Sequence, residues 1–251
     1  MPHQFTVSLD YTARALPGWF LFNTWLQRAL GDDIHLEVFD DPVVQSQAVR
    51  EGRIDFYYAN PYDATNLIRN EGFLAVAAPR ARFDEALIAV RADSPVDRVE
   101  ELLPGLRVSA TRDQDVRRMC MILLEPADLH GRNVTITTRE SYVLVAKALL
   151  QAEADVGFFL EATFGELSNL VKSALRPLIR SRISTIRHVL LVSPKFASQV
   201  APLQARLEAM AGEERGKNVL DSLGFEGWEG LEQEDVEFMI DLMDTLIEKV
   251  A

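Results

Sequence analysis

Two stretches of this sequence place polar side chains where a short apolar strand is expected to turn into a helix. In the first, residues 52–67 (GRIDFYYANPYDATNL), Asn60 suits a helix N-cap, Pro61 suits the first helical position, and Tyr62 and Asp63 follow. A helix start leaves backbone N–H groups unpaired, and together with amide, phenol and carboxylate side chains it is suited to holding a small polar ligand. In the second, residues 148–167 (ALLQAEADVGFFLEATFGEL), Glu161 occupies the corresponding helix start. The repetition predicts two similar lobes that face each other across a cleft.

The sequence shows no recognisable catalytic or metal-binding motif. The sequence contains no P-loop, no GxGxxG motif after a strand and no GxSxG elbow, and no nucleophile–base pair can be named. The four histidines lack a ligand spacing such as i, i+4 on a helix. We therefore expect no metal, no cofactor and no enzymatic activity.

Composition narrows the classes of partner. The chain has 251 residues, 48% of them hydrophobic, and a formal net charge of −12 at pH 7, which argues against nucleic acid as a partner. Its single cysteine, Cys120, excludes an intramolecular disulfide, and its apolar surroundings favour a buried structural thiol. There is neither a signal-peptide pattern nor an apolar run of about 18 residues, so we expect no membrane insertion. The expected location is cytoplasmic, or periplasmic if a leader has been removed.

The elements that must position these residues follow in a β-α-β-α-β-α order. Strands are expected at residues 5–10, 34–40 and 55–59, each followed by a helix, and this order favours a mostly parallel sheet covered by helices on both faces. We assign residues 1–82 and 189–251 to the first lobe and residues 83–188 to the second. Two hinge crossings, near residues 82 and 188, join the lobes.

Four longer stretches occur in order along nearly the whole chain: GRIDFYYANPYDA, EALIAVRADSPVDRVEELLPGLRVSAT, DVGFFLE and VLDSLGFEGWEGLEQEDVEFMIDLM. This ordered set resembles the phosphate/phosphite/phosphonate substrate-binding proteins of ABC uptake systems. The resemblance implies an α/β fold of the type II periplasmic-binding-protein kind, a two-lobed Venus flytrap that closes on a small polar ligand in the cleft between its lobes.

The resemblance also implies positions for the ligand contacts. The family grips its anion with small hydroxyl residues and glycine at the start of a helix. Here that position reads Thr111-Arg112-Asp113-Gln114, with a single hydroxyl. At the position of a second loop of the family, this sequence has Glu140-Ser141-Tyr142 and no histidine. Glu161 corresponds to an acidic residue of the family. The implied ligand-binding set is Tyr11, Thr12, Asn60, Tyr62, Asp63, Thr111, Arg112, Asp113, Gln114, Ser141, Tyr142 and Glu161.

Three functions remain open from the sequence. The first is a solute-binding protein; because the anion loop differs from the family pattern, a ligand with a positive or zwitterionic part would suit the acids Asp63, Asp113, Glu140 and Glu161. The second is a regulatory module that binds a protein partner, for which the apolar stripe of residues 236–247 offers a docking face. The third is a cytoplasmic enzyme on the same fold.

Overall fold

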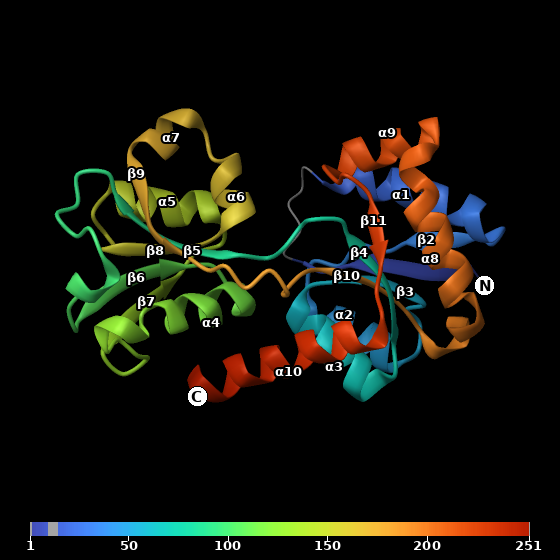
Figure 1. Ribbon diagram of the computed structural model, residues 1–251, viewed down its shortest axis with the longest axis horizontal. Helices are drawn as coiled ribbons and strands as arrows, with labels where there is room; N and C mark the ends of the chain where they lie inside the picture. Colours follow the sequence, from blue (N-terminus) through green and yellow to red (C-terminus); the bar gives the residue numbers. More distant parts are fainter. Residues whose placement is uncertain (1, 10–14, 251) are drawn as a thin grey trace. The chain divides into compact units, whose positions relative to one another are not determined.

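The computed structural model describes residues 2–9 and 15–250. The chain forms two compact units, each built on its own sheet (Figure 1). Unit 1 comprises Met1–Arg82 and Arg187–Asp241, and unit 2 comprises Phe83–Ile186 and Leu242–Ala251. The lobes proposed from the sequence differ from these units at residues 187–188 and from Leu242 onward, because the end of the last helix belongs to unit 2 and not to unit 1.

The sheet of unit 1 has six strands in the order β11-β4-β10-β3-β1-β2. Their bounds are β1 His3–Val7, β2 Ile34–Leu36, β3 Phe56–Ala59, β4 Leu74–Pro79, β10 Val189–Val192 and β11 Trp228–Gly230. The first four run in one direction, whereas β10 and β11 run against them. The sheet is therefore mixed. Most of its strands run in one direction, as expected of a mostly parallel sheet, but most neighbouring strands are paired antiparallel, because β10 and β11 lie beside β3 and β4.

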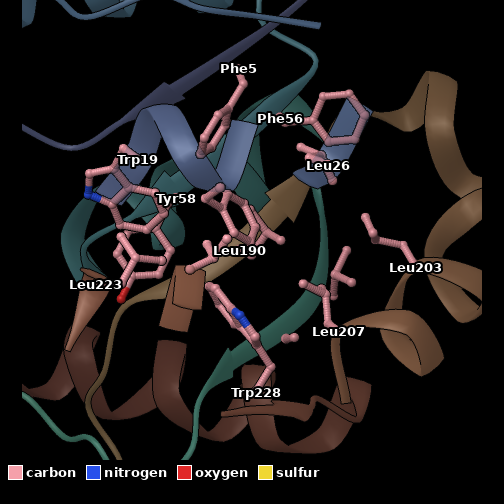
Figure 2. Packing of buried hydrophobic residues seen from close by; sticks show 14 of the residues in the cluster. Phe5, Trp19, Leu26, Phe56, Tyr58, Leu190, Leu203, Leu207, Leu223 and Trp228 are labelled. Atoms are coloured by element: carbon pink, nitrogen blue, oxygen red, sulfur yellow. The ribbon is translucent and has the colours of Figure 1, made fainter. Parts of the chain in front are cut away.

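Successive side chains along the strands of unit 1 point to opposite faces of the sheet, so each face packs against its own apolar layer. Phe56 and Tyr58 face one layer, whereas Tyr57 and Ala59 face the other, as the two-residue period of a strand requires. The first layer, seen in Figure 2, contains residues of α1 (Leu16–Leu30), α8 (Val200–Ala209) and α9 (Glu214–Leu223). The second contains residues of α2 (Pro42–Arg50), α3 (Pro61–Glu71) and α10 (Gln233–Val250).

The sheet of unit 2 has five strands in the order β7-β6-β8-β5-β9. Their bounds are β5 Ala86–Arg91, β6 Leu106–Ala110, β7 Val134–Thr138, β8 Val156–Leu160 and β9 Leu175–Arg180. β5 runs against the other four. One face is covered by α4 (Gln114–Leu123), and the other by α5 (Tyr142–Leu150) and α6 (Glu161–Glu166), followed by α7 (Asn169–Ser173).

Shorter turns complete the described chain. Four 3-10 helices span Val99–Glu101, Glu125–Ala127, Pro194–Gln199 and Met210–Gly212. The first of these is short because Pro95 and Pro104 leave little helical sequence between them. In α10, Val236, Met239 and Ile240 are buried in the core of unit 1 and Met243 in that of unit 2. The described part of its apolar stripe is therefore core and offers no free docking face.

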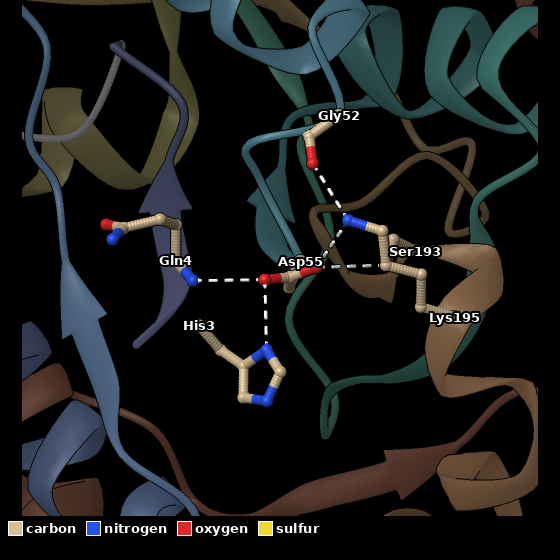
Figure 3. A network of polar contacts seen from close by, with 6 residues as sticks. All are labelled: His3, Gln4, Gly52, Asp55, Ser193 and Lys195. Carbon is tan, nitrogen blue, oxygen red and sulfur yellow. Dashed lines mark hydrogen bonds and ion pairs between the residues drawn. The ribbon is translucent and has the colours of Figure 1, made fainter. Parts of the chain in front are cut away.

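Each unit has an aspartate in the same position, directly before a central strand of its sheet, which supports the internal repeat seen in the sequence. Asp55 precedes β3 and exchanges backbone and side-chain hydrogen bonds with Gln4, as Figure 3 shows in part. Asp155 precedes β8 and does the same with Arg107. The surroundings differ, because the side chain of Asp55 is 8% exposed and that of Asp155 is 41% exposed.

Candidate functional site

In unit 1, the carboxyl ends of β1 and β3 carry a hydrogen-bonded polar cluster. Ser8 follows β1, and its hydroxyl donates to Oδ2 of Asp63 at 2.8 Å while accepting the N–H of Asn60 at 2.9 Å. The side chain of Asn60 caps α3 by accepting the N–H of Asp63 at 2.7 Å, which confirms the predicted N-cap. The hydroxyl of Tyr57 also lies 3.3 Å from Oδ2 of Asp63. The structure thus brings together Asn60 and Asp63 from the predicted set.

Tyr62 is the exposed aromatic residue beside this cluster. It is the second residue of α3 and is 44% exposed. A phenol in this position offers both a ring face and a hydroxyl. The other two residues predicted for this lobe, Tyr11 and Thr12, lie outside the described residues.

In unit 2, a second polar cluster lies at the carboxyl ends of β6 and β7. Thr111 follows β6 and is buried, and its hydroxyl accepts the N–H of Asp113 at 3.3 Å. Asp113 is the N-cap of α4, with Oδ1 accepting the N–H of Val116 at 3.1 Å. Its Oδ2 accepts the hydroxyl of Tyr142 at 2.8 Å. Three of the predicted residues, Thr111, Asp113 and Tyr142, therefore form one connected group.

The other residues predicted around α4 and α5 are more exposed. Arg112 pairs with Glu140 at 3.4 Å, and both side chains are at least three-quarters exposed. Gln114, the first residue of α4, is exposed, and Ser141 caps α5 by accepting the N–H of Leu144. Farther along α4, burial lowers the pKa of the Arg117 guanidinium, an effect that the nearby charge of Asp113 opposes. Arg117 donates to the hydroxyl of Thr138.

The last predicted residue, Glu161, forms an ion pair across the sheet. It is the first residue of α6, directly after β8, and its Oε1 lies 2.8 Å from Nη1 of Arg180. Arg180 is the last residue of β9. Because β8 and β9 both run against β5, their carboxyl ends lie at the same edge of the sheet as Thr111.

These contacts alter the charge balance expected from the sequence. Each acid expected to favour a cationic ligand already has a donor within its own unit: Ser8 and Tyr57 for Asp63, Tyr142 and a helix N–H for Asp113, Arg112 for Glu140 and Arg180 for Glu161. A carboxylate that already accepts such bonds offers less to an incoming ammonium group. The structure therefore gives no support to a preference for cationic ligands.

Sequence reasoning missed Ser8 and Arg180. Ser8 lies within the first strand expected from the sequence, residues 5–10, and follows the strand only because β1 ends at Val7. Arg180 carries no signal in the sequence, because its contact with Glu161 depends on β5 lying between β8 and β9. In residues 2–9 and 15–250 no group of three or more His, Cys, Asp or Glu side chains is arranged to hold a metal ion.

Comparison with known proteins places the chain in a family. The sequence matches the family described as "ABC transporter, phosphonate, periplasmic substrate-binding protein" over residues 5–236, which is most of the chain. The protein belongs to this phosphonate-binding family. The resemblance inferred from the sequence is thereby confirmed, and so is its assignment as a solute-binding protein of an ABC-transporter family.

Solved structures show the same fold at low sequence identity. PhnD1 from Prochlorococcus marinus, in complex with methylphosphonate, aligns with a TM-score of 0.80 at 12% identity and covers 97% of each chain. XAC2383 from Xanthomonas citri, bound to chloride ion, aligns with a TM-score of 0.80 at 16% identity and covers 99% of each chain. The aliphatic sulphonate-binding protein SsuA from Escherichia coli aligns with a TM-score of 0.71 at 14% identity, covering 98% of this chain and 92% of its own. Among curated proteins, none matches the sequence.

For this member of the phosphonate-binding family, the α/β fold with two helix-covered sheets is established by these matches and by the topology. The helices of the described residues include none that is long and apolar enough to cross a lipid bilayer.

Proposed function

We propose that this protein binds a small oxyanion, of the phosphonate, phosphate or sulfonate class, and releases it unchanged. Family membership over residues 5–236 carries this proposal. The engaged acids support it, because they leave no carboxylate without a donor among the predicted contacts. Structural relatives that share the fold are described in complex with methylphosphonate, with chloride and with ATP, all of which are anions.

We assign the ligand contacts to the residues at the carboxyl ends of the strands in each unit. In unit 1 these are Asn60, Tyr62 and Asp63, with Tyr11 and Thr12 remaining predictions. In unit 2 they are Thr111, Arg112, Asp113, Gln114, Ser141, Tyr142 and Glu161. Hydroxyl and N–H donors at the carboxyl ends of strands are suited to oxyanion oxygens. Asp63, Asp113 and Glu161 serve such a site by orienting donor side chains, because a carboxylate itself repels an oxyanion.

Thermal unfolding of the purified protein against a ligand panel tests the binding function. The panel contains phosphate, phosphite, methylphosphonate, sulfate, methanesulfonate, ATP, amino acids and quaternary amines. A ligand present at about 100 times its dissociation constant stabilises by about 2.7 kcal/mol, which for a chain of this size is roughly 5 to 10 °C. Shifts confined to the oxyanions support the proposal, and shifts confined to the amines contradict it.

Two variants test the location of the site. Thr111→Val removes a hydroxyl at the carboxyl end of β6 and should abolish most of the oxyanion shift. Thr135→Val removes an exposed hydroxyl from β7, near its amino end, and should leave the shift intact. Equal losses in both variants would contradict the assignment of the site.

Two further parts of the proposal have separate tests. Recovery of the ligand unchanged after long incubation, measured by phosphorus NMR for a phosphonate, tests the absence of turnover. The family is described as periplasmic, whereas the sequence-based expectation is a cytoplasmic protein. Fractionation of cells that produce the protein decides between these compartments, and the location decides whether the bound ligand serves a transporter or another partner.

A further inference from the structure

Arg180 lies where a ligand at the carboxyl edge of unit 2 would meet it. In the sheet, Leu87 of β5 is paired with Phe159 of β8 on one side and with Arg180 of β9 on the other. Glu161 follows β8 by one residue, so the guanidinium and the carboxylate meet over the end of β5. Thr111 follows β6, which pairs with β8 in parallel, and therefore lies at the same edge.

The ion pair uses only part of the arginine. A single contact, Nη1 to Oε1 at 2.8 Å, joins the two side chains, which are 50% and 36% exposed. Within the described part of the chain, the side chain of Arg180 makes no other polar contact. A guanidinium has five N–H donors in a planar fork, so Nε and Nη2 remain able to bind a second oxyanion side by side.

The carboxylate of Glu85, at the same edge of the sheet, does not compete for these donors. Glu85, which directly precedes β5, accepts the hydroxyl of Ser181 and the N–H groups of Ile183 and Ser184, the latter two at 3.1 and 2.7 Å. Glu85 is therefore fully occupied in holding the loop after β9. Glu161 alone orients Arg180, and Arg180 in turn neutralises Glu161.

We propose that Arg180 is a ligand-contacting, specificity-determining residue: held by Glu161, it binds an oxyanion group of the ligand and disfavours ligands that carry an ammonium group. The inference rests on the proposed function. An ammonium group that approached Glu161 would lie beside the guanidinium of Arg180, and the two positive charges would repel each other. An oxyanion would instead add a second acceptor to a guanidinium already held in place, with little further ordering needed.

Titration calorimetry with two matched ligands tests this assignment. Ethylphosphonate and 2-aminoethylphosphonate differ only by the ammonium group. The wild-type protein should bind ethylphosphonate more tightly. Arg180→Gln should weaken ethylphosphonate binding by about tenfold or more, because a charge-assisted contact is lost. The same variant should shift the preference toward 2-aminoethylphosphonate, because Glu161 is released.

Three further variants separate specificity from folding. Arg180→Lys keeps the charge but not the fork and should give an intermediate loss. Glu161→Gln added to Arg180→Gln should abolish the gain for 2-aminoethylphosphonate. Arg91→Gln breaks a more exposed ion pair, with Asp93, at the opposite end of β5 and should change neither affinity. Circular dichroism and melting temperature identify any variant that is misfolded.

The outcomes distinguish this inference from the proposed function. If the wild-type protein binds ethylphosphonate and Arg180→Gln binds both ligands with unchanged affinities, the inference is overturned and the proposed function stands. A wild-type preference for 2-aminoethylphosphonate overturns the inference as well. If the wild-type protein binds neither these ligands nor any oxyanion of the panel, the proposed function fails and the inference fails with it.

Discussion

The two equivalent aspartates, Asp55 and Asp155, should respond very differently to the same substitution. Both bind the strand beside them in the same way, so Asp55→Asn and Asp155→Asn change one atom at matching positions of the internal repeat. In Asp55, Oδ2 lies 3.2 Å from Nδ1 of His3 and 3.3 Å from the N–H of Gln4. Its Oδ1 lies 3.3 Å from Nζ of Lys195 and 3.5 Å from the hydroxyl of Ser193 (Figure 3).

The expected loss of unfolding free energy follows from the number of donors around Asp55. An asparagine side chain presents one oxygen, so one side of the buried network would meet an NH2 group instead of an acceptor. A buried donor left without a partner costs about 1–3 kcal/mol, and the lost charge adds to it, so we expect Asp55→Asn to destabilise unit 1 by about 2–4 kcal/mol. For Asp155→Asn we expect less than about 1 kcal/mol, because the carboxylate is 41% exposed and solvent screens its pairing with Arg107.

Guanidinium unfolding followed by tryptophan fluorescence measures the first effect. The three tryptophans, Trp19, Trp25 and Trp228, all belong to unit 1, so their fluorescence reports on that unit. Far-UV circular dichroism follows both units. Asp55→Asn should lower the fluorescence midpoint with an unchanged slope, and Asp155→Asn should leave the unfolding of unit 2, followed by circular dichroism, almost unchanged. A loss below about 0.5 kcal/mol for Asp55→Asn, or equal losses for the two variants, would refute the reasoning from burial.

Two further predictions concern unit 2. Hydrogen bonding from Arg107 lowers the pKa of Asp155, so its stabilising contribution should be complete above the unfolded pKa of about 3.9 and be lost as the pH falls below it. The difference in free energy of unfolding between the wild-type protein and Asp155→Asn should therefore shrink between about pH 6 and pH 2, and a constant difference would contradict this. Burial raises the pKa of the Cys120 thiol, so a thiol reagent such as DTNB should react slowly with the native protein and quickly in denaturant. Rapid reaction in the native state would show that the face of α4 carrying Cys120 is accessible.

Local sequence signals predicted the elements near the unit 1 site. Asn60 and Pro61 start α3 as expected, because cap preference and the fixed φ of proline act within a few residues. Gly72 adopts a left-handed conformation and ends the same helix, which few other residues do readily. Glu161 begins α6 as expected. These features depend on neighbours in the chain, so one sequence suffices to find them.

Long-range pairing could not be predicted in the same way. β11 (Trp228–Gly230) has only three residues and no alternation of its own, and it exists because it pairs with the end of β4. The bond between Tyr142 and Asp113 joins the starts of two helices that follow neighbouring strands. Their proximity depends on strand order, which hydrophobic periodicity does not encode.

The position of β10 also constrains the order in which the chain can fold. β10 lies between β4 and β3 in the sheet of unit 1, yet it follows all five strands of unit 2 in the sequence. Its contacts span long stretches of chain: Ser193, the residue after it, bonds with Asp55, 138 positions earlier. By contrast, all five strands of unit 2 lie between Ala86 and Arg180.

During synthesis, a chain that has reached Ile186 carries every strand of unit 2 but only separate parts of the unit 1 sheet. β3 and β4 have no partner in common until Val189–Val192 arrives between them. Pairing across such long separations is slow because the closure entropy must be overcome first. The sheet of unit 2 is therefore the part that can fold early. The sheet of unit 1 carries exposed strand edges until β10 is made, and chaperone binding to nascent chains should concentrate there.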